Sequence, residues 1–273
     1  MSDPRPIGVF DSGVGGLTVA RAILEDLPNE PILYLGDNGR FPYGPRPVDE
    51  IRRFGLELAS FLVSRDVKML VSACNTIEVA AIEDIGNAAG IPVVGVIDPG
   101  VRAAVRVTRN GRVGMIGTLA TVASEAYDRA VARTGRDIRL FSEACPAFVE
   151  HVERGDTSSP ELRAVAATYL APLIGAGVDT LILGCTHYPL LRGLIAHIMG
   201  PDVTLVSSAE ETAKDVYAAL LDGDMLREDA TPPEHRFLTT GDPAMFQSIA
   251  DRFLGPDVAS VRATSTEPMG TAS

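Results

Sequence analysis

The sequence predicts an α/β protein made of two pseudo-symmetric domains with mostly parallel sheets. Three observations predict this fold class. Short apolar runs alternate with helix-length segments along most of the 273 residues, as in βαβ units. Each run ends in small or polar residues, and parallel sheets bind ligands at such strand ends. Two stretches of the first half are also echoed in the second half.

The expected strands are uninterrupted apolar runs, which suit strands that are buried on both faces of a sheet. A helix-like stretch follows each of them. In chain order these runs are Ile7–Phe10, Ile32–Leu35, Met69–Ser72, Pro92–Val96, Val113–Ile116, Thr180–Leu183 and Val203–Val206.

The segment after Val206 contains two helix-like stretches, Ala209–Leu221 and Pro243–Leu254, with the apolar pair Phe237-Leu238 between them. It is too small for a separate domain, so we expect it to complete the first one. The predicted domains are therefore residues 1–98 together with 208–273, and residues 99–207.

The internal echo pairs strand ends. Ile7–Ser12 resembles Val113–Thr118, and Met69–Thr76 resembles Thr180–His187, at offsets of 106 and 111 residues. If the two domains are related, Cys74 and Cys185 occupy equivalent strand ends. Domains that face each other across a cleft would then present these two thiols from opposite walls.

The composition excludes several classes of protein. The formal net charge is −12 and no long basic run offsets it, so neither nucleic acid nor an anionic membrane is an expected partner. No uncharged apolar stretch is long enough to span a bilayer, and the polar segment Met1–Pro6 contains no apolar signal core. The three cysteines lack CxxC spacing, which argues against a zinc site and a disulfide scaffold. Reduced thiols in the cytoplasm are the expected state.

Two of the predicted strand ends carry groups suited to binding or chemistry. Asp11-Ser12-Gly13-Val14-Gly15-Gly16 follows the first strand, where backbone N–H groups at the start of a helix can approach an anion. This loop does not match the GxGxxG dinucleotide pattern. The third strand ends in Cys74-Asn75-Thr76, and a helix N-terminus there would lower the thiol pKa.

Asn75 and Glu78 also fit a simple structural interpretation, because an N-cap with an acidic residue three positions later forms a capping box. A carboxylate close to a thiolate would raise the pKa of the thiol. Glu78 is therefore an unexpected neighbour for a reactive Cys74.

The most specific stretch is Gly184-Cys185-Thr186-His187-Tyr188-Pro189, which places a thiol, a hydroxyl and an imidazole on one strand-to-helix turn. A Cys–His protease would use this turn alone and leave Cys74 and Asp11 without a role. Cys145 has no cluster of polar neighbours, and we assign it a structural role.

These motifs together resemble the glutamate racemases of the aspartate/glutamate racemase family. The resemblance rests on the Asp11–Gly16 loop, Pro42-Tyr43-Gly44, Cys74-Asn75-Thr76 and Gly184-Cys185-Thr186-His187-Tyr188-Pro189-Leu190-Leu191, and it covers about Ile7 to Leu254. It implies two pseudo-symmetric α/β domains with the active site in the cleft between them. It also implies racemisation of glutamate for peptidoglycan synthesis, with neither a cofactor nor a metal. The sequence does not decide the oligomeric state, for which a homodimer is the candidate.

The resemblance also implies roles for individual residues. By this resemblance, Cys74 would act on D-glutamate and Cys185 on L-glutamate. Inversion in either direction needs a base on one face of the substrate and an acid on the other. The assisting groups would be Asp11, His187 and Glu153. The residues that match substrate contacts in the family are Asp11, Ser12, Pro42, Tyr43, Gly44, Asn75, Thr76, Thr118, Thr121, Thr186 and His187.

The sequence departs from the family pattern at Asn38, Ile77 and Glu78, where Thr and small residues are usual. These departures bear on the shape of the pocket, the reaction rate and the strictness of the preference for glutamate, but they do not involve the two thiols. An aspartate or related amino-acid racemase is the nearest alternative, and a non-catalytic two-domain amino-acid-binding protein is the alternative from another class.

Overall fold

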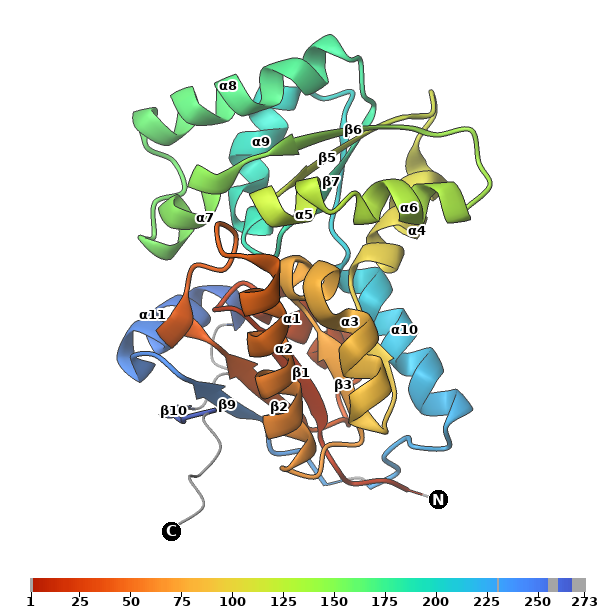
Figure 1. Ribbon diagram of the computed structural model, residues 1–273, viewed down its shortest axis with the longest axis vertical. Coiled ribbons are helices and arrows are strands. Elements are labelled where there is room, and N and C mark those ends of the chain that lie inside the picture. Colours follow the sequence, from red (N-terminus) through yellow and green to blue (C-terminus); the bar gives the residue numbers. More distant parts are fainter. Residues whose placement is uncertain (1, 230, 255–259, 267–273) are drawn as a thin grey trace.

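A computed structural model describes residues 2–229, 231–254 and 260–266, and within them it contains two parallel β-sheets stacked end to end (Figure 1). The first sheet has the strand order β10-β9-β2-β1-β3-β4 and the second β6-β5-β7-β8. The strands are β1 Ile7–Asp11, β2 Ile32–Gly36, β3 Met69–Ser72, β4 Val93–Val94, β5 Arg112–Gly117, β6 Arg139–Ala144, β7 Thr180–Gly184, β8 Thr204–Val206, β9 Arg236–Thr239 and β10 Val261–Ala263. The predicted α/β fold class is confirmed.

Helices cover both sheets. Those around the first sheet are α1 Leu17–Asp26, α2 Val48–Val63, α3 Asn75–Ala89, α10 Ala209–Asp222 and α11 Pro243–Leu254, with the 3-10 turn η1 Asn38–Arg40. Those around the second are α4 Ile97–Val107, α5 Leu119–Ala123, α6 Ala126–Arg133, α7 Pro146–Glu153, α8 Pro160–Gly175 and α9 Arg192–Met199, with η2 Tyr188–Leu191. In the part of the chain that is described, none of these helices is long and apolar enough to cross a membrane.

The two sheets share one topology. The order β2-β1-β3-β4 in the first sheet matches β6-β5-β7-β8 in the second, so β1 corresponds to β5 and β3 to β7. All strand pairs are parallel. The echoed sequences therefore occupy equivalent strands. Cys74 lies two residues after the end of β3, and Cys185 directly follows the end of β7.

The central strands are buried along their whole length, as their apolar sequences predicted. Every residue of β1, β2, β3 and β7 is buried. Removing such runs from water is the main stabilising contribution to the fold. Strand β4 is shorter than the expected run Pro92–Val96, because only Val93 and Val94 pair with β3.

Two strands lie outside the predicted set. Strand β6 has the sequence RLFSEA, and none of its residues is fully buried because it forms an edge of the second sheet. Its mixed polar sequence contains no continuous apolar run of the kind that predicted the other strands. Strand β10 is an edge strand of three residues beside β9.

The chain crosses between the sheets twice. It leaves the first sheet after β4 through α4, and after β8 it returns through α10, which packs against both α1 and α4. Strand β9 then joins the first sheet next to β2. The proposed domain boundaries near residues 98 and 207 stay a prediction.

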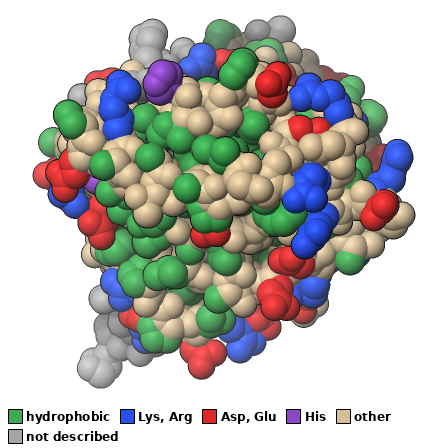
Figure 2. Space-filling view, turned by 90° about the horizontal axis from the view of Figure 1, so that it is seen from above, with side chains coloured by type: hydrophobic (Ala, Val, Ile, Leu, Met, Phe, Trp, Pro, Cys, Tyr) green, Lys and Arg blue, Asp and Glu red, His purple; other side chains and the backbone are tan. Residues whose placement is uncertain are grey.

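On the face seen in Figure 2, acidic and basic side chains are interspersed, so this face has no continuous basic surface.

Candidate active site

Residues that follow strands of both sheets line one cavity of about 120 Å³, and Cys74 and Cys185 are among them. Each thiol comes from a different half of the fold. Both cysteines are unpaired and nearly buried, with 5% and 6% of their surfaces exposed. Of the predicted residues, those that line this cavity are Ser12, Pro42, Tyr43, Gly44, Cys74, Asn75, Thr76, Thr118, Cys185, Thr186 and His187.

Cys74 is the N-cap residue of α3 and has an extended backbone conformation. Its Sγ lies 3.5 Å from the hydroxyl oxygen of Ser12. Burial raises the pKa of Cys74 to about 12, and the nearby Asp11 carboxylate adds to this effect, whereas the contact with Ser12 opposes it. This site therefore favours the protonated thiol, despite the helix N-terminus that was expected to lower its pKa.

Cys185 has a different polar environment, which is an imidazole backed by a carboxylate. Its Sγ lies 3.7 Å from Nδ1 of His187, and Nε2 of the same ring lies 2.6 Å from Oε1 of Glu153. Burial lowers the pKa of His187, but the contacts with Cys185 and Glu153 outweigh it, so its pKa is raised well above the usual value. The protonated form of the His187 ring is therefore favoured beside the Cys185 sulfur.

Asp11 lies beneath the cavity and does not line it. The residue is fully buried, and its Oδ1 accepts a hydrogen bond from the backbone N–H of Gly13 at 2.8 Å. Its Oδ2 accepts a hydrogen bond from the Thr186 hydroxyl at 3.0 Å. Burial raises the pKa of Asp11, whereas the His187 imidazole opposes this. Asp11 therefore connects the loop after β1 with the loop after β7.

Gly15 allows this close approach of the two loops. A Cβ atom at Gly15 would lie 2.3 Å from Oγ1 of Thr186 and 2.7 Å from Nδ1 of His187. Any larger residue would push the Cys185 turn away from the first half of the fold. The glycine-rich loop of the sequence is therefore explained by close packing of two loops as well as by the start of α1.

Hydroxyl and amide groups connect the two halves along another wall. The hydroxyls of Thr76 and Thr118 lie 3.0 Å apart, and Thr118 lies equally close to the hydroxyl of Thr121. Thr118 is also the N-cap of α5 and accepts a hydrogen bond from the backbone N–H of Thr121. Asn75 Oδ1 accepts a hydrogen bond from the Tyr127 hydroxyl at 2.7 Å. Thr121 is fully buried and, like Glu153, does not line the cavity.

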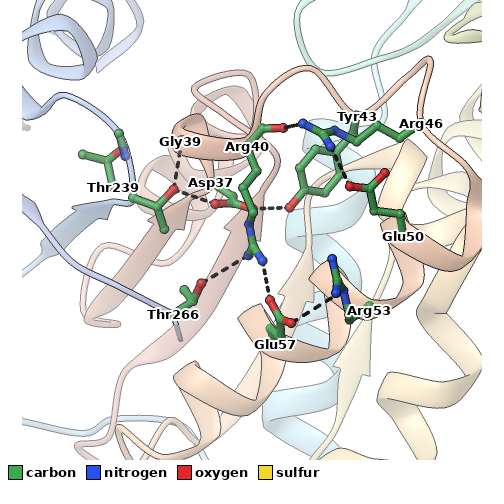
Figure 3. Close-up of polar contacts among 12 residues, drawn as sticks. Asp37, Gly39, Arg40, Tyr43, Arg46, Glu50, Arg53, Glu57, Thr239 and Thr266 are labelled. Atoms are coloured by element: carbon green, nitrogen blue, oxygen red, sulfur yellow. Dashed lines mark hydrogen bonds and ion pairs between the residues drawn. The ribbon is translucent and has the colours of Figure 1, made fainter. Parts of the chain in front are cut away.

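A polar network anchors the loop that carries Pro42, Tyr43 and Gly44 (Figure 3). Buried Asp37 accepts hydrogen bonds from the Tyr43 hydroxyl and from Arg40 Nε, and Arg40 also contacts Glu57 of α2. Burial and Asp37 raise the pKa of Tyr43 well above its usual value. Because the hydroxyl is bonded to Asp37, Tyr43 offers the cavity its ring and backbone.

Several cavity residues lay outside the sequence predictions. They are mostly apolar, and they are Phe41, Pro45, Leu119, Pro146, Val149 and Glu150. Pro146, Val149 and Glu150 belong to α7, which follows the unpredicted strand β6. A predicted strand at β6 would have marked them as strand-end residues.

The three departures from the family pattern do not line this cavity. Asn38 Oδ1 accepts a hydrogen bond from Thr239, and Ile77 is buried in the core beneath α2. Asn75 and Glu78 do not form the capping box that the sequence suggested, because Cys74 is the N-cap and its side chain makes no capping bond. The Glu78 carboxylate instead accepts hydrogen bonds from Val96 and Ile97.

The arrangement suits proton transfer at a carbon atom between two thiols. One thiol has a hydroxyl neighbour and the other an imidazole that can exchange a proton, and hydroxyl, amide and backbone groups between them can bind carboxylates. Among the described residues, no group of three or more His, Cys, Asp or Glu side chains could hold a metal ion. A larger cavity of about 570 Å³ lies elsewhere and is lined by neither thiol.

Comparisons with known proteins identify relatives of this chain. Residues 7–216 match the model of the Asp/Glu/Hydantoin racemase family. The glutamate racemase of Parafrankia sp. (strain EAN1pec) is 57% identical over 257 residues, which are 94% of this chain and 93% of that protein.

Two solved structures have similar folds. The glutamate racemase isoform RacE1 from Bacillus anthracis superposes with a TM-score of 0.89 at 44% identity and covers 95% of this chain and 96% of its own. The glutamate racemase from Francisella tularensis, in complex with D-glutamate, has a TM-score of 0.90 at 37% identity, with coverage of 97% and 99%.

Proposed function

This chain belongs to the Asp/Glu/hydantoin racemase family, and on that premise we propose that it is a glutamate racemase that interconverts L- and D-glutamate without a cofactor. The observation that carries the proposal is the single cavity lined by both Cys74 and Cys185. A non-catalytic binding protein needs a cleft but has no use for two thiols that reach it from different halves.

In the proposed reaction, one thiolate removes the α-proton and the thiol on the other face donates a proton to the planar carbanion. Cys185 acts on L-glutamate, with His187 and Glu153 exchanging and orienting its proton. Cys74 acts on D-glutamate, with Asp11 as the buried charge that holds the surrounding loops. Each turnover leaves the thiols with their protonation states exchanged, so both must equilibrate with water before the next turnover in the same direction.

Substrate binding is assigned to the polar lining of the cavity. The donors that we expect to contact the two carboxylates are hydroxyl, amide and backbone N–H groups, which bind anions without a net positive charge on the protein. These donors are supplied by Ser12, Tyr43, Gly44, Asn75, Thr76, Thr118 and Thr186. Pro42 shapes the loop, and Thr121 supports Thr118 from beneath.

The cellular role follows from the reaction. We propose that the enzyme supplies D-glutamate for peptidoglycan synthesis and works in the cytoplasm, where thiols stay reduced. A homodimer is the proposed assembly.

The choice between glutamate and aspartate tests the proposal. Glutamate should be turned over with a kcat/KM ~10- to 200-fold above that for aspartate, the range that one methylene group provides in a fitted pocket. Circular dichroism follows the loss of ellipticity as each L-enantiomer is racemised, at several substrate concentrations. Comparable or reversed values would assign the chain to the aspartate branch, and binding of glutamate without inversion would indicate the non-catalytic alternative.

A further inference from the structure

Glu78 is a buried carboxylate that the two-thiol reaction does not use. It lies in the first turn of α3, four residues after Cys74, and has only 9% of its surface exposed. It does not line the cavity that contains the thiols. A buried carboxylate is costly unless it is hydrogen-bonded, so its position requires an explanation.

The carboxylate binds the segment where the chain crosses from the first sheet to the second. Oε2 accepts hydrogen bonds from the backbone N–H groups of Val96 at 2.6 Å and Ile97 at 3.2 Å, and Oε1 lies 3.3 Å from the same Ile97 nitrogen. Val96 is the N-cap of α4 and Ile97 its first residue. Gly95 leaves room for this contact, because a Cβ atom there would lie 2.3 Å from Oε1 of Glu78.

Helix α4 continues this connection into the second half. Its residues Ile97, Val101 and Ala104 belong to the same buried cluster as Ile182, and α4 packs against β7. Ile182 lies in β7, three residues before Cys185. A continuous set of packed elements thus leads from Cys74 through α3, Glu78 and α4 to the strand that ends at Cys185.

We propose that Glu78 is a positioning residue that holds the two thiols at the correct separation across the cavity by fixing the start of α4 to the first turn of α3. This inference rests on the two-thiol function proposed above. It gives a role to the residue that departs from the family pattern at this position. Reaction rates depend steeply on such placement, since a shift of about 1 Å costs up to ~100-fold.

The two halves of the fold should stay together when the Glu78 carboxylate is removed, so the role of this residue can be tested by substitution. The halves are also connected by the bonds from Tyr127 to Asn75 and from Thr186 to Asp11, and Tyr127 lies in the same cluster as Ile97. Glu78→Ala is therefore expected to leave a folded protein. Glu78→Gln keeps an oxygen that can accept both N–H groups, and Gly95→Ala displaces the carboxylate without altering Glu78 itself. Glu83→Ala removes an exposed carboxylate from the same helix and is the matched control.

The test compares a reaction that needs both thiols with one that needs a single thiol. Racemisation of glutamate requires both. For a glutamate analogue with chlorine at the β-carbon, one thiolate takes the α-proton, the electron pair of that bond forms a carbon–carbon double bond, and chloride leaves. For each variant we would measure the rate of glutamate racemisation and the rate of elimination from each enantiomer of the analogue. The thermal unfolding of each variant is measured as well.

In Glu78→Ala and Gly95→Ala, racemisation should fall ~30- to 100-fold, while elimination from either enantiomer changes little. Glu78→Gln and Glu83→Ala should racemise close to the wild-type rate. An equal loss of racemisation and elimination in Glu78→Ala would show a general structural role and overturn the inference. Unchanged racemisation in Gly95→Ala, or failure of Glu78→Gln to restore it, would also overturn it. If the wild-type protein does not racemise glutamate, the proposed function fails instead.

Discussion

Replacing either Cys74 or Cys185 with serine should reduce racemisation of glutamate by roughly two to four orders of magnitude, the contribution expected of a positioned proton-transfer group. Serine keeps the shape of the side chain but is a much weaker acid than a thiol. Both cysteines are nearly buried, so the small change in volume leaves the cavity intact. The measurement is the initial rate of racemisation by circular dichroism, starting from each enantiomer.

Each single variant should keep the half-reaction of its remaining thiol. Cys185→Ser retains Cys74 and should still eliminate chloride from the D-enantiomer of the β-chloro analogue. Cys74→Ser should do so only from the L-enantiomer. Cys145→Ser is the matched control, because Cys145 is buried outside the cavity. Near wild-type racemisation in either of the first two variants would make that cysteine a packing residue and refute the two-thiol mechanism.

The second large effect is expected for His187→Asn, which removes a side chain that contacts both Cys185 and Glu153. Loss of a proton-exchanging partner costs ~10²- to 10⁴-fold. Elimination from the L-enantiomer of the analogue should fall by this factor, whereas elimination from the D-enantiomer, which uses Cys74, should change little. His197→Asn, on the exposed side of α9, is the control.

Elimination is the informative measurement for this variant because it is irreversible. The two enantiomers of glutamate have equal free energies, so any variant must have the same kcat/KM for racemisation in both directions. Racemisation rates therefore cannot reveal which thiol His187 assists. An equal loss of elimination from both enantiomers would contradict the assignment of His187 to Cys185.

The repeated arrangement of the fold could be predicted because its signal is local. The runs at Ile7–Phe10, Met69–Ser72 and Thr180–Leu183 are apolar throughout, and burial on both faces of a parallel sheet requires that composition. Strand β6 gave no such signal, because an edge strand is partly exposed and tolerates Ser142 and Glu143. Its absence from the prediction also concealed the α7 residues that line the cavity.

The site could be predicted as a set of residue types but not as a set of contacts. Cys74, Cys185 and His187 stand in short, specific motifs at strand ends. The partners of Tyr43 and Glu78 depend on side-chain direction, which periodicity does not encode. The Tyr43 hydroxyl turns to Asp37, and Glu78, which the sequence placed near a thiol, turns to the start of α4. Such contacts join segments that only the folded chain brings together.

The most direct test of the central claim is the reaction of the purified protein with L-glutamate in D₂O, after treatment with a metal chelator. Circular dichroism follows the inversion, and proton NMR follows the α-position. If two thiols act on opposite faces, the circular dichroism signal should decay to zero. Newly formed D-glutamate should carry deuterium at the α-carbon, because the donating thiol has exchanged its proton with the solvent. Absence of inversion, or D-glutamate that retains the original α-proton, would contradict the account.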